Sequence, residues 1–351
     1  TRPEIIKMSP VIRECQKRKI NFFILHTNQH YSENMDKIFF EELSLPLPKY
    51  NLGIGSASHG EMTGKMLIGI EKVLVKEKPD LVLIEGDTNT VLASALAAVK
   101  LQIKIAHIEA GLRSHFREMP EEINRTLVDH CSDFLFAPTG EAKKNLIKEG
   151  ISEKKIFVVG NTIVDAIYQN LRLSSRKSKV LNSLNLKRRK YLLTTIHRQE
   201  NVDNKEKLKN ILKGLKLVWR KTSLPIIFPI HPRTRNRIKK FELKIPEGII
   251  TIQPKGYLDF LSLERNSRLI LTDSGGIQEE ACILKVPCVT LRENTERPET
   301  LKVKSNILVG TDPEKILKGA IKMLKKKPNW ENPFGDERSA KRIISILIKK
   351  L

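Results

Sequence analysis

The chain has 351 residues, of which 40% are hydrophobic, and its 63 Lys and Arg outnumber its 40 Asp and Glu to give a net charge of +23. This length exceeds what one ordinary hydrophobic core accommodates, so two α/β domains are expected. No apolar run approaches the roughly 20 residues that span a bilayer, and we therefore expect no membrane partner. The basic residues are spread along the whole chain without a recognition motif, which favours a solvated, lysine-rich surface over nucleic-acid binding.

In the first half of the chain, apolar runs of strand length alternate with helical patterns. Strands are expected within INFFILHT (20–27), LVLIE (81–85), KIAHIEAG (104–111), CSDFLFAPT (131–139) and KIFVVGNT (155–162). A helix is expected at VLASALAAVKL (91–101). This order is typical of a parallel sheet that helices cover on both faces.

Between residues 170 and 190 the pattern gives way to a polar, basic, serine-containing stretch, and we place a domain boundary at its start. The strand-and-helix order then resumes. Further strands are expected within KYLLTTIHR (190–198), LPIIFPIHP (224–232), IITIQPKGY (249–257), SRLILTDSGG (267–276), VPCVTLRE (286–293) and SNILVG (305–310). The tail, 336–351, has apolar residues at helical spacing and predicts a terminal helix.

The spacing of cysteine and histidine indicates neither disulfides nor a metal site. No cysteine belongs to a CxxC pair, so buried thiols in a reducing cytoplasm are expected for all four: Cys15, Cys131, Cys282 and Cys288. His26 and His30 have a spacing that could bind a metal on a helix, but no third ligand accompanies them.

The distinctive polar segments follow predicted strands in both halves. In a parallel sheet, ligands bind beyond the carboxyl ends of the strands. The segments at these ends are EGDTNT, HIEAGLRS, TIHRQEN, IHPRT, TDSGG and RENTERPE. The simplest arrangement is an active site in a cleft between two domains whose strand ends face one another.

The TDSGG segment, between a strand and a helix, predicts an anion site. Ser274, Gly275 and Gly276 are candidates for binding phosphate oxygens, because glycines allow close approach and the first amides of a helix point outward. The alternative is a tight turn with Asp273 or Ser274 as a helix N-cap. Glu280 lies one turn into the helix, where it could accept hydrogen bonds from a ribose diol.

Arg297 adds a charge-assisted contact to a diphosphate, so these residues together indicate a nucleotide site. Three carboxylates of the first half are candidates for acid–base chemistry: Asp87, Glu109 and Glu121. The alternative for each is a cap or a salt bridge, which is the commoner role of a carboxylate.

The motifs TRPEIIKMSP, GDTNT, HIEAGLRS, PEEINR, HRQEN, HPRT, DSGGIQEEA and TERPET, in that order, closely resemble the non-hydrolysing UDP-N-acetylglucosamine 2-epimerases. The match covers nearly the whole chain. The resemblance implies a glycosyltransferase B type α/β fold with two Rossmann-like domains, at 1–169 and 170–330, and a final helix (331–351) that crosses back to the first domain. It also implies a homodimer that interconverts UDP-GlcNAc and UDP-ManNAc.

Carried over residue by residue, the resemblance implies a catalytic cleft with Arg2, Lys7, Asp87, Glu109, Glu121 and His197. It implies UDP contacts by Ser274, Gly275, Gly276, Glu280 and Arg297. Related hydrolysing enzymes tend to have Arg after the Gly-Asp of the first-domain motif, where this chain has Thr88. Members of the family also have an apolar strand ahead of TRPE, so we expect one to precede Thr1.

Inversion at C2 favours elimination of UDP to a glycal followed by re-addition, because the C2 hydrogen becomes acidic only when the C1–O bond loosens. The resemblance implies the same route. No NAD or metal is expected, since the oxidation level of the sugar does not change. A hydrolysing epimerase that releases free ManNAc and a glycosyltransferase of the same fold remain as alternatives.

Overall fold

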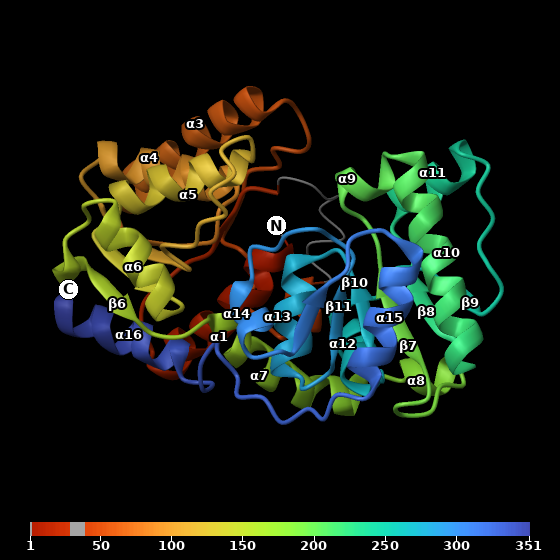
Figure 1. Cartoon of the computed structure of the whole chain (residues 1–351). Coiled ribbons are helices and arrows are strands. Elements are labelled where there is room, and N and C mark those ends of the chain that lie inside the picture. The colour runs from red at the N-terminus through yellow and green to blue at the C-terminus, as the bar shows by residue number, and fades with distance from the viewer. Residues whose placement is uncertain (1, 29–38) are drawn as a thin grey trace. The chain divides into compact units, whose positions relative to one another are not determined.

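The computed structural model describes residues 2–28 and 39–351, with the backbone only at Arg2. The chain forms two compact units (Figure 1). Unit 1 comprises Thr1–Gln169 with Phe334–Leu351, and unit 2 comprises Asn170–Pro333.

Unit 1 is an α/β structure whose strands all pair in parallel. Its strands are β1 (Leu25–His26), β2 (Tyr50–Asn51), β3 (Leu81–Glu85), β4 (Lys104–Ile108), β5 (Phe134–Ala137) and β6 (Ile156–Val158). Its helices are α1 (Arg2–Lys17), α3 (His59–Glu77), α4 (Asn89–Lys100), α5 (Pro120–Cys131), α6 (Gly140–Lys148), the 3₁₀ turn η1 (Glu153–Lys155), the start of α7 (Thr162–Lys177) and α16 (Ser339–Lys350).

The main sheet of unit 1, in the order β3-β4-β5-β6, is covered by helices on both faces. Alternation along β4 assigns its residues to the two faces. Ile105 belongs to a core formed with α3, α4 and α5, which lie side by side (Figure 1). Ala106 and Ile108 belong to a core formed with α1 and α16, which pack against each other. The sheet thus brings the residues that follow β3 and β4 to one edge.

The strand predicted over 20–27 is much shorter in the structure, where only Leu25–His26 form β1. In the described part of the chain, β1 pairs with β2 alone and β3 pairs with β4 alone. A cavity of about 770 Å³ is lined by residues of both 20–27 and β3, together with α1 and α16. An apolar run becomes a regular strand only where neighbouring backbone takes up its hydrogen bonds, and residues 20–24 have little such pairing.

The polar stretch that begins at residue 170 is also more regular than predicted. Most of it is helical, because α7 continues to Lys177 and α8 (Val180–Ser183) follows. The buried positions of this part of α7, Asn170 and Ser174, are polar, so no apolar periodicity marks the helix.

Unit 2 has one six-stranded parallel sheet, in the order β12-β11-β10-β7-β8-β9. Its strands are β7 (Leu192–Thr195), β8 (Ile226–Pro229), β9 (Ile249–Ile252), β10 (Ile270–Thr272), β11 (Cys288–Thr290) and β12 (Asn306–Leu308). Its helices after α8 are α9 (Gln199–Val202), α10 (Lys205–Thr222), α11 (Pro232–Lys240), α12 (Tyr257–Asn266), α13 (Gly275–Ile283), α14 (Pro298–Lys302) and α15 (Pro313–Leu324). Buried side chains of α10 and α15 pack on the sheet to form a hydrophobic core.

Among the described residues, no helix is long and apolar enough to cross a membrane. The same residues contain no group of three or more His, Cys, Asp or Glu side chains that could hold a metal ion. His30 lies outside the described residues. All four cysteines are free thiols.

Candidate active site

The first cluster of polar residues lies in unit 1, where α1 approaches the ends of β3 and β4. The Lys7 Nζ donates to Oε1 and Oε2 of Glu109, each at 2.6 Å, and lies 3.3 Å from Oε1 of Glu85. The Asn161 amide also donates to Oε1 of Glu109, at 3.0 Å. Glu109 has a left-handed backbone, with φ of 72°, which is costly for a non-glycine residue and is typical of functional sites. The predicted residues Lys7 and Glu109 are therefore in direct contact.

Glu85, the last residue of β3, belongs to this cluster although the sequence analysis did not select it. Its side chain is buried. Burial raises the pKa of Glu85 well above its ordinary value; Lys7 opposes this effect, and the nearby carboxylates of Glu109, Glu4 and Asp87 reinforce it. Lys7 thus lies between two buried carboxyl groups. When Glu85 is protonated and neutral, the positive charge of Lys7 pairs with Glu109 alone.

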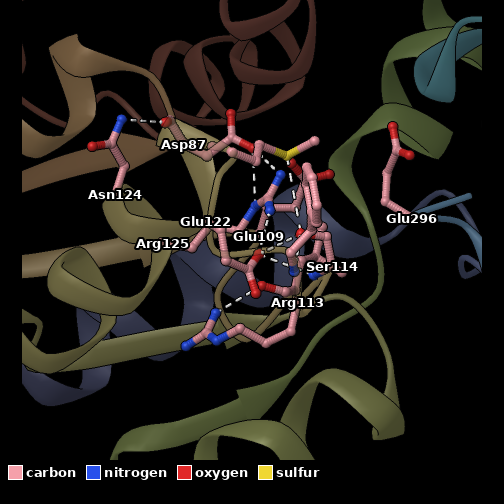
Figure 2. Close-up of polar contacts among 12 residues, drawn as sticks. Asp87, Glu109, Arg113, Ser114, Glu122, Asn124, Arg125 and Glu296 are labelled. Atoms are coloured by element: carbon pink, nitrogen blue, oxygen red, sulfur yellow. Dashed lines mark hydrogen bonds and ion pairs between the residues drawn. The ribbon is translucent and has the colours of Figure 1, made fainter. Parts of the chain in front are cut away.

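Asp87 lies just beyond β3 and is fixed from α5 (Figure 2). Arg125 donates to Oδ2 of Asp87 from Nε at 3.0 Å and from Nη2 at 2.6 Å. The Asn124 side-chain amide donates to the backbone carbonyl of Asp87 at 2.8 Å. The side chain of Asp87 is still 31% exposed. It is therefore held in one orientation and remains reachable by a ligand.

The two adjacent glutamates at the start of α5 have different surroundings. Glu122 accepts hydrogen bonds from the backbone amides of Ser114 and His115, both at 2.9 Å, and from Arg125 Nη1 at 2.7 Å (Figure 2). Burial would raise the pKa of Glu122, but these hydrogen bonds outweigh burial and lower it. Glu121 is half-buried, and among the described residues no hydrogen bond or ion pair to its side chain is found. Glu122 is thus committed to the loop, and Glu121 is the better acid–base candidate.

A buried ion pair between His107 and Asp129 contacts the loops that follow β3 and β4. His107 Nδ1 lies 2.7 Å from Oδ1 of Asp129, and His107 Nε2 lies 2.8 Å from the carbonyl oxygen of Gly86. Asp129 also accepts from the Gly111 amide at 3.1 Å and from Arg113 at 2.8 Å. Because both ring nitrogens face acceptors, His107 donates from both. This pair ties the loop before Asp87 to the loop after Glu109.

The second cluster lies in unit 2, at the start of α13. Ser274 is the N-cap residue, but its side chain makes no capping hydrogen bond. Asp273 is used elsewhere: it accepts from the backbone amides of His197 at 3.1 Å and Arg198 at 3.0 Å, and from Asn201 at 3.1 Å. Neither side chain therefore caps the helix, and the first amides of α13 remain suited to an anion.

His197 follows β7 and is the predicted catalytic histidine of unit 2. Its Nε2 lies 4.0 Å from Oδ1 of Asp273, and its ring is 6.2 Å from that of His231. Burial lowers the pKa of His197; Asp273 opposes this effect, while Arg198 and His231 add to it. The imidazole is therefore disposed to be neutral and can accept or donate a proton.

The two glutamates of α13 are both largely buried. Arg297 Nε lies 2.9 Å from Oε1 of Glu279, so this arginine is already paired with the neighbour of the predicted ribose ligand. Glu280 lies one residue further along the helix. Arg297 thus lies beside α13, as is required if the arginine and the helix bind the same nucleotide.

The side chain of Arg2 lies outside the described part of the structure. Sequence reasoning missed Glu85, Asn161, Arg125 and Asp129. The contacts that join them to the two strand-end loops span 16 or more residues of the chain, and no local spacing reveals such pairs.

Comparison with known proteins decides the family. A sequence model described as UDP-N-acetylglucosamine 2-epimerase matches residues 13–348. A Methanocaldococcus jannaschii protein named UDP-N-acetylglucosamine 2-epimerase is 62% identical over 354 residues, covering 99% of this chain and 96% of that protein. The chain belongs to the UDP-N-acetylglucosamine 2-epimerase family. This confirms the family that the motifs indicate.

Solved structures agree with this assignment to the 2-epimerase family. The crystal structure of M. jannaschii UDP-GlcNAc 2-epimerase in complex with UDP-GlcNAc and UDP has a TM-score of 0.92 and 62% identity, covering 99% of this chain and 98% of that one. A Pseudomonas aeruginosa protein named UDP-2,3-diacetamido-2,3-dideoxy-D-glucuronate 2-epimerase is 42% identical over 352 residues, or 99% of this chain and 97% of that protein. The predicted α/β fold of glycosyltransferase B type is confirmed, and the chain is an enzyme of the isomerase class.

Proposed function

We propose that this 2-epimerase interconverts UDP-GlcNAc and UDP-ManNAc without releasing free ManNAc. The observation that carries the proposal is the grouping of Asp87, Lys7 and Glu109 at the ends of β3 and β4. Carboxylates held beside a cation at strand ends are suited to proton transfer. A relative that matches 99% of the chain is named for UDP-N-acetylglucosamine, which supports the same substrate.

The proposed reaction begins with loss of UDP. The C1–O bond to the diphosphate breaks, the oxygen leaves with the electron pair, and a carboxylate removes the C2 proton to give 2-acetamidoglucal. UDP then adds back to C1 while a proton is delivered to the opposite face of C2. Asp87, Glu109 and Glu121 form the acid–base group, and Lys7 holds Glu109 in place.

UDP is bound by unit 2 in this proposal. The start of α13 (Ser274, Gly275 and Gly276) takes phosphate oxygens, and Glu280 takes the ribose. Arg297 and His197 stabilise the departing diphosphate, and Arg2 contributes from α1. The reaction therefore requires residues of both units to reach one substrate.

Thr88 favours return of UDP over attack by water. Its hydroxyl donates to Oε1 of Glu4 at 2.6 Å, so it continues the polar network of α1. The resemblance associates arginine at this position with the hydrolysing enzymes. A threonine bonded to the protein itself brings no additional charge to the glycal.

UDP-2,3-diacetamido-2,3-dideoxy-glucuronate is the second candidate substrate, because a relative with 42% identity is named for its epimerisation. Both sugars carry an acetamido group at C2, so the same acids could act on either. The higher identity to the M. jannaschii protein favours UDP-GlcNAc.

Incubation with UDP-GlcNAc alone tests the proposal. We expect UDP-ManNAc at equilibrium with substrate. Free ManNAc would indicate the hydrolysing reaction, and turnover only after addition of an acceptor would indicate a glycosyltransferase. Faster turnover of the diacetamido-glucuronate nucleotide than of UDP-GlcNAc would assign the second substrate.

We also propose a homodimer that works in the cytoplasm, with no nucleic-acid or membrane partner. The four free thiols fit a reducing compartment. Sedimentation velocity should give a species of twice the chain mass of 40.1 kDa, and a monomer at all concentrations would contradict the dimer.

A further inference from the structure

Three arginines from two loops of unit 2 gather around one carboxylate, Glu296. Arg198 follows β7, while Arg292 and Arg297 flank the loop between β11 and α14. Glu296 Oε1 accepts from Arg198 Nη2 at 3.1 Å, and Oε2 accepts from Arg292 Nη1 at 2.8 Å. Burial alone would raise the pKa of Glu296, but Arg297, Arg292 and Arg198 outweigh burial and hold it at about 2. The carboxylate is therefore ionised at every pH where the protein works.

Glu296 also lies directly against the start of α13. A Cβ atom built on Gly275 would be 2.2 Å from Oε1 of Glu296, whereas one built on Gly276 would meet nothing within 4 Å. Neither glycine has a left-handed backbone. The backbone conformation therefore does not require a glycine at position 275. The space that it leaves is filled by the Glu296 carboxylate.

The three arginines differ in how many of their donors are used. Arg292 is 6% exposed and also bonds Glu200 and Asn294, so its guanidinium is a structural part of the loop. Arg297 is paired with Glu279. Arg198 is 35% exposed. Within residues 2–28 and 39–351, the one hydrogen bond found for the five N–H donors of its guanidinium is the bond to Glu296. Arg198 is thus the guanidinium best able to take a further anion.

We propose that Glu296 is a positioning residue that holds the Arg198 guanidinium beside the first turn of α13, where Arg198 binds the diphosphate of the substrate. This inference rests on the proposed function, because it assumes that the nucleotide binds at α13. It adds two residues to that site.

Glu296 affects diphosphate binding in two opposing ways, by ordering Arg198 and by repelling the anion. An arginine that is already held loses less rotamer freedom on binding, which corresponds to about a two- to twelvefold gain in affinity for one ordered side chain. The charge of Glu296 repels the diphosphate, but two guanidiniums already compensate it at hydrogen-bond distance. Positioning therefore outweighs repulsion, and loss of Glu296 should weaken diphosphate binding.

The affinities of UDP and uridine in Glu296→Gln provide the test. UDP binding, measured by calorimetry, should weaken about tenfold, and uridine binding, measured by NMR titration, should stay within about twofold of wild type. Glu296→Asp should recover part of the UDP affinity. Glu293→Gln is the matched control, because this exposed glutamate of the same loop loses the same charge and should leave both affinities unchanged.

A double-mutant cycle makes the test independent of uridine. Gly275→Ala should weaken UDP binding in the wild-type background, since its Cβ displaces Glu296. It should cost little more in the Glu296→Ala background, and Arg198→Ala should likewise be non-additive with Glu296→Gln. Circular dichroism must show that each variant is folded.

Several results would overturn the inference: unchanged or tighter UDP binding in Glu296→Gln, an equal loss for uridine, or additive effects in the cycle. A wild-type protein that binds no UDP would instead contradict the proposed function. The two failures are therefore distinct.

Discussion

At the scale of single residues, the carboxylates of unit 1 separate into those that hold the structure and those available for chemistry. Glu122 accepts backbone and arginine donors, and Asp129 is enclosed by His107 and Arg113. Asp87 is bonded on one oxygen by Arg125 and remains partly exposed. A carboxylate enclosed on both oxygens by backbone, histidine or arginine donors is a poor proton carrier. This excludes Glu122 and Asp129 and leaves Asp87, Glu109 and Glu121 as the proposed acids.

The first prediction concerns these three acids. Asp87→Asn, Glu109→Gln and Glu121→Gln should each lower kcat by about 10²–10⁴-fold, because an amide cannot transfer the proton. UDP affinity should stay near that of the parent, since we place UDP on unit 2. Glu122→Gln is the contrast: it should lower the melting temperature. An acid variant that binds UDP and turns over at the parental rate would show that its residue is structural.

The second prediction concerns Glu280. Glu280→Ala should weaken UDP binding by about 1.5–3 kcal/mol, the range for a hydrogen bond to a charged group. Calorimetry with UDP measures this loss directly. UMP should lose a similar amount, because the ribose is common to both ligands, and equal affinity of variant and parent would remove Glu280 from the site.

The third prediction uses the raised pKa of Glu85. Its carboxyl stays protonated above the ordinary glutamate pKa, and it ionises only as the pH rises through the raised value. The ionised Glu85 then competes with Glu109 for Lys7, while Glu4 and Asp87 add further negative charge nearby. Activity should therefore fall on the alkaline side.

Glu85→Gln fixes the neutral form. The alkaline limb of its kcat profile should move to higher pH while the acid limb stays in place. Identical profiles for parent and variant would show that Glu85 does not titrate in this role.

Sequence alone could select candidate residues of unit 2 that lie within one motif, such as Ser274 and Glu280, because a strand, a turn and a helix place them. It did not identify Glu85 or Glu296. Each acts through a partner that is more than 70 residues away, Lys7 in one case and Arg198 in the other. Such pairs depend on tertiary packing rather than on spacing.

At the scale of elements, β4 and α5 are joined by the buried His107–Asp129 pair. Burial alone would lower the pKa of His107, but Asp129 outweighs burial and raises it. Burial alone would raise the pKa of Asp129, but His107 and Arg113 outweigh burial and lower it. The pair therefore stabilises the fold between these two ionisations.

The fourth prediction follows from these signs. The stabilisation by Asp129 is present above its unfolded pKa and is lost as the pH falls through its folded pKa. The stabilisation by His107 is complete below its unfolded pKa and is lost as the pH rises through its folded pKa.

Asp129→Asn should cost about 3–5 kcal/mol of unfolding free energy near neutral pH, because it leaves a buried cation unpaired. Urea unfolding of parent and variant across the pH range measures this difference. The cost should shrink at both extremes, and a constant cost at all pH values would contradict the account.

Most elements followed from periodicity, and β3 spans the residues 81–85 that its apolar run predicts. The failures have physical causes. Residues 20–24 are mostly apolar but largely lack a neighbouring strand to pair with. The end of α7 was missed because its buried positions, Asn170 and Ser174, are polar. Composition indicates where a strand can form, whereas pairing determines whether it does.

At the scale of the whole molecule, we propose that the acid–base residues belong to unit 1 and the nucleotide-binding residues to unit 2. The βαβ order in each half predicted two parallel sheets. Unit 2 has one parallel sheet, and unit 1 has a four-stranded parallel sheet together with the separate β1-β2 pair. The family of the chain could be predicted because eight motifs occur in the expected order. No sequence pattern indicates which face of C2 each carboxylate serves, since that depends on how the sugar is oriented in the complex.

The central claim is that the C2 proton is removed and replaced while UDP leaves and returns. Conversion of UDP-GlcNAc in heavy water, followed by proton NMR, tests it most directly. Product UDP-ManNAc should carry deuterium at C2, and small amounts of UDP and 2-acetamidoglucal should escape as the intermediate leaks. Full retention of the original hydrogen at C2 during conversion would contradict proton exchange, and with it the roles given to Asp87, Glu109 and Glu121.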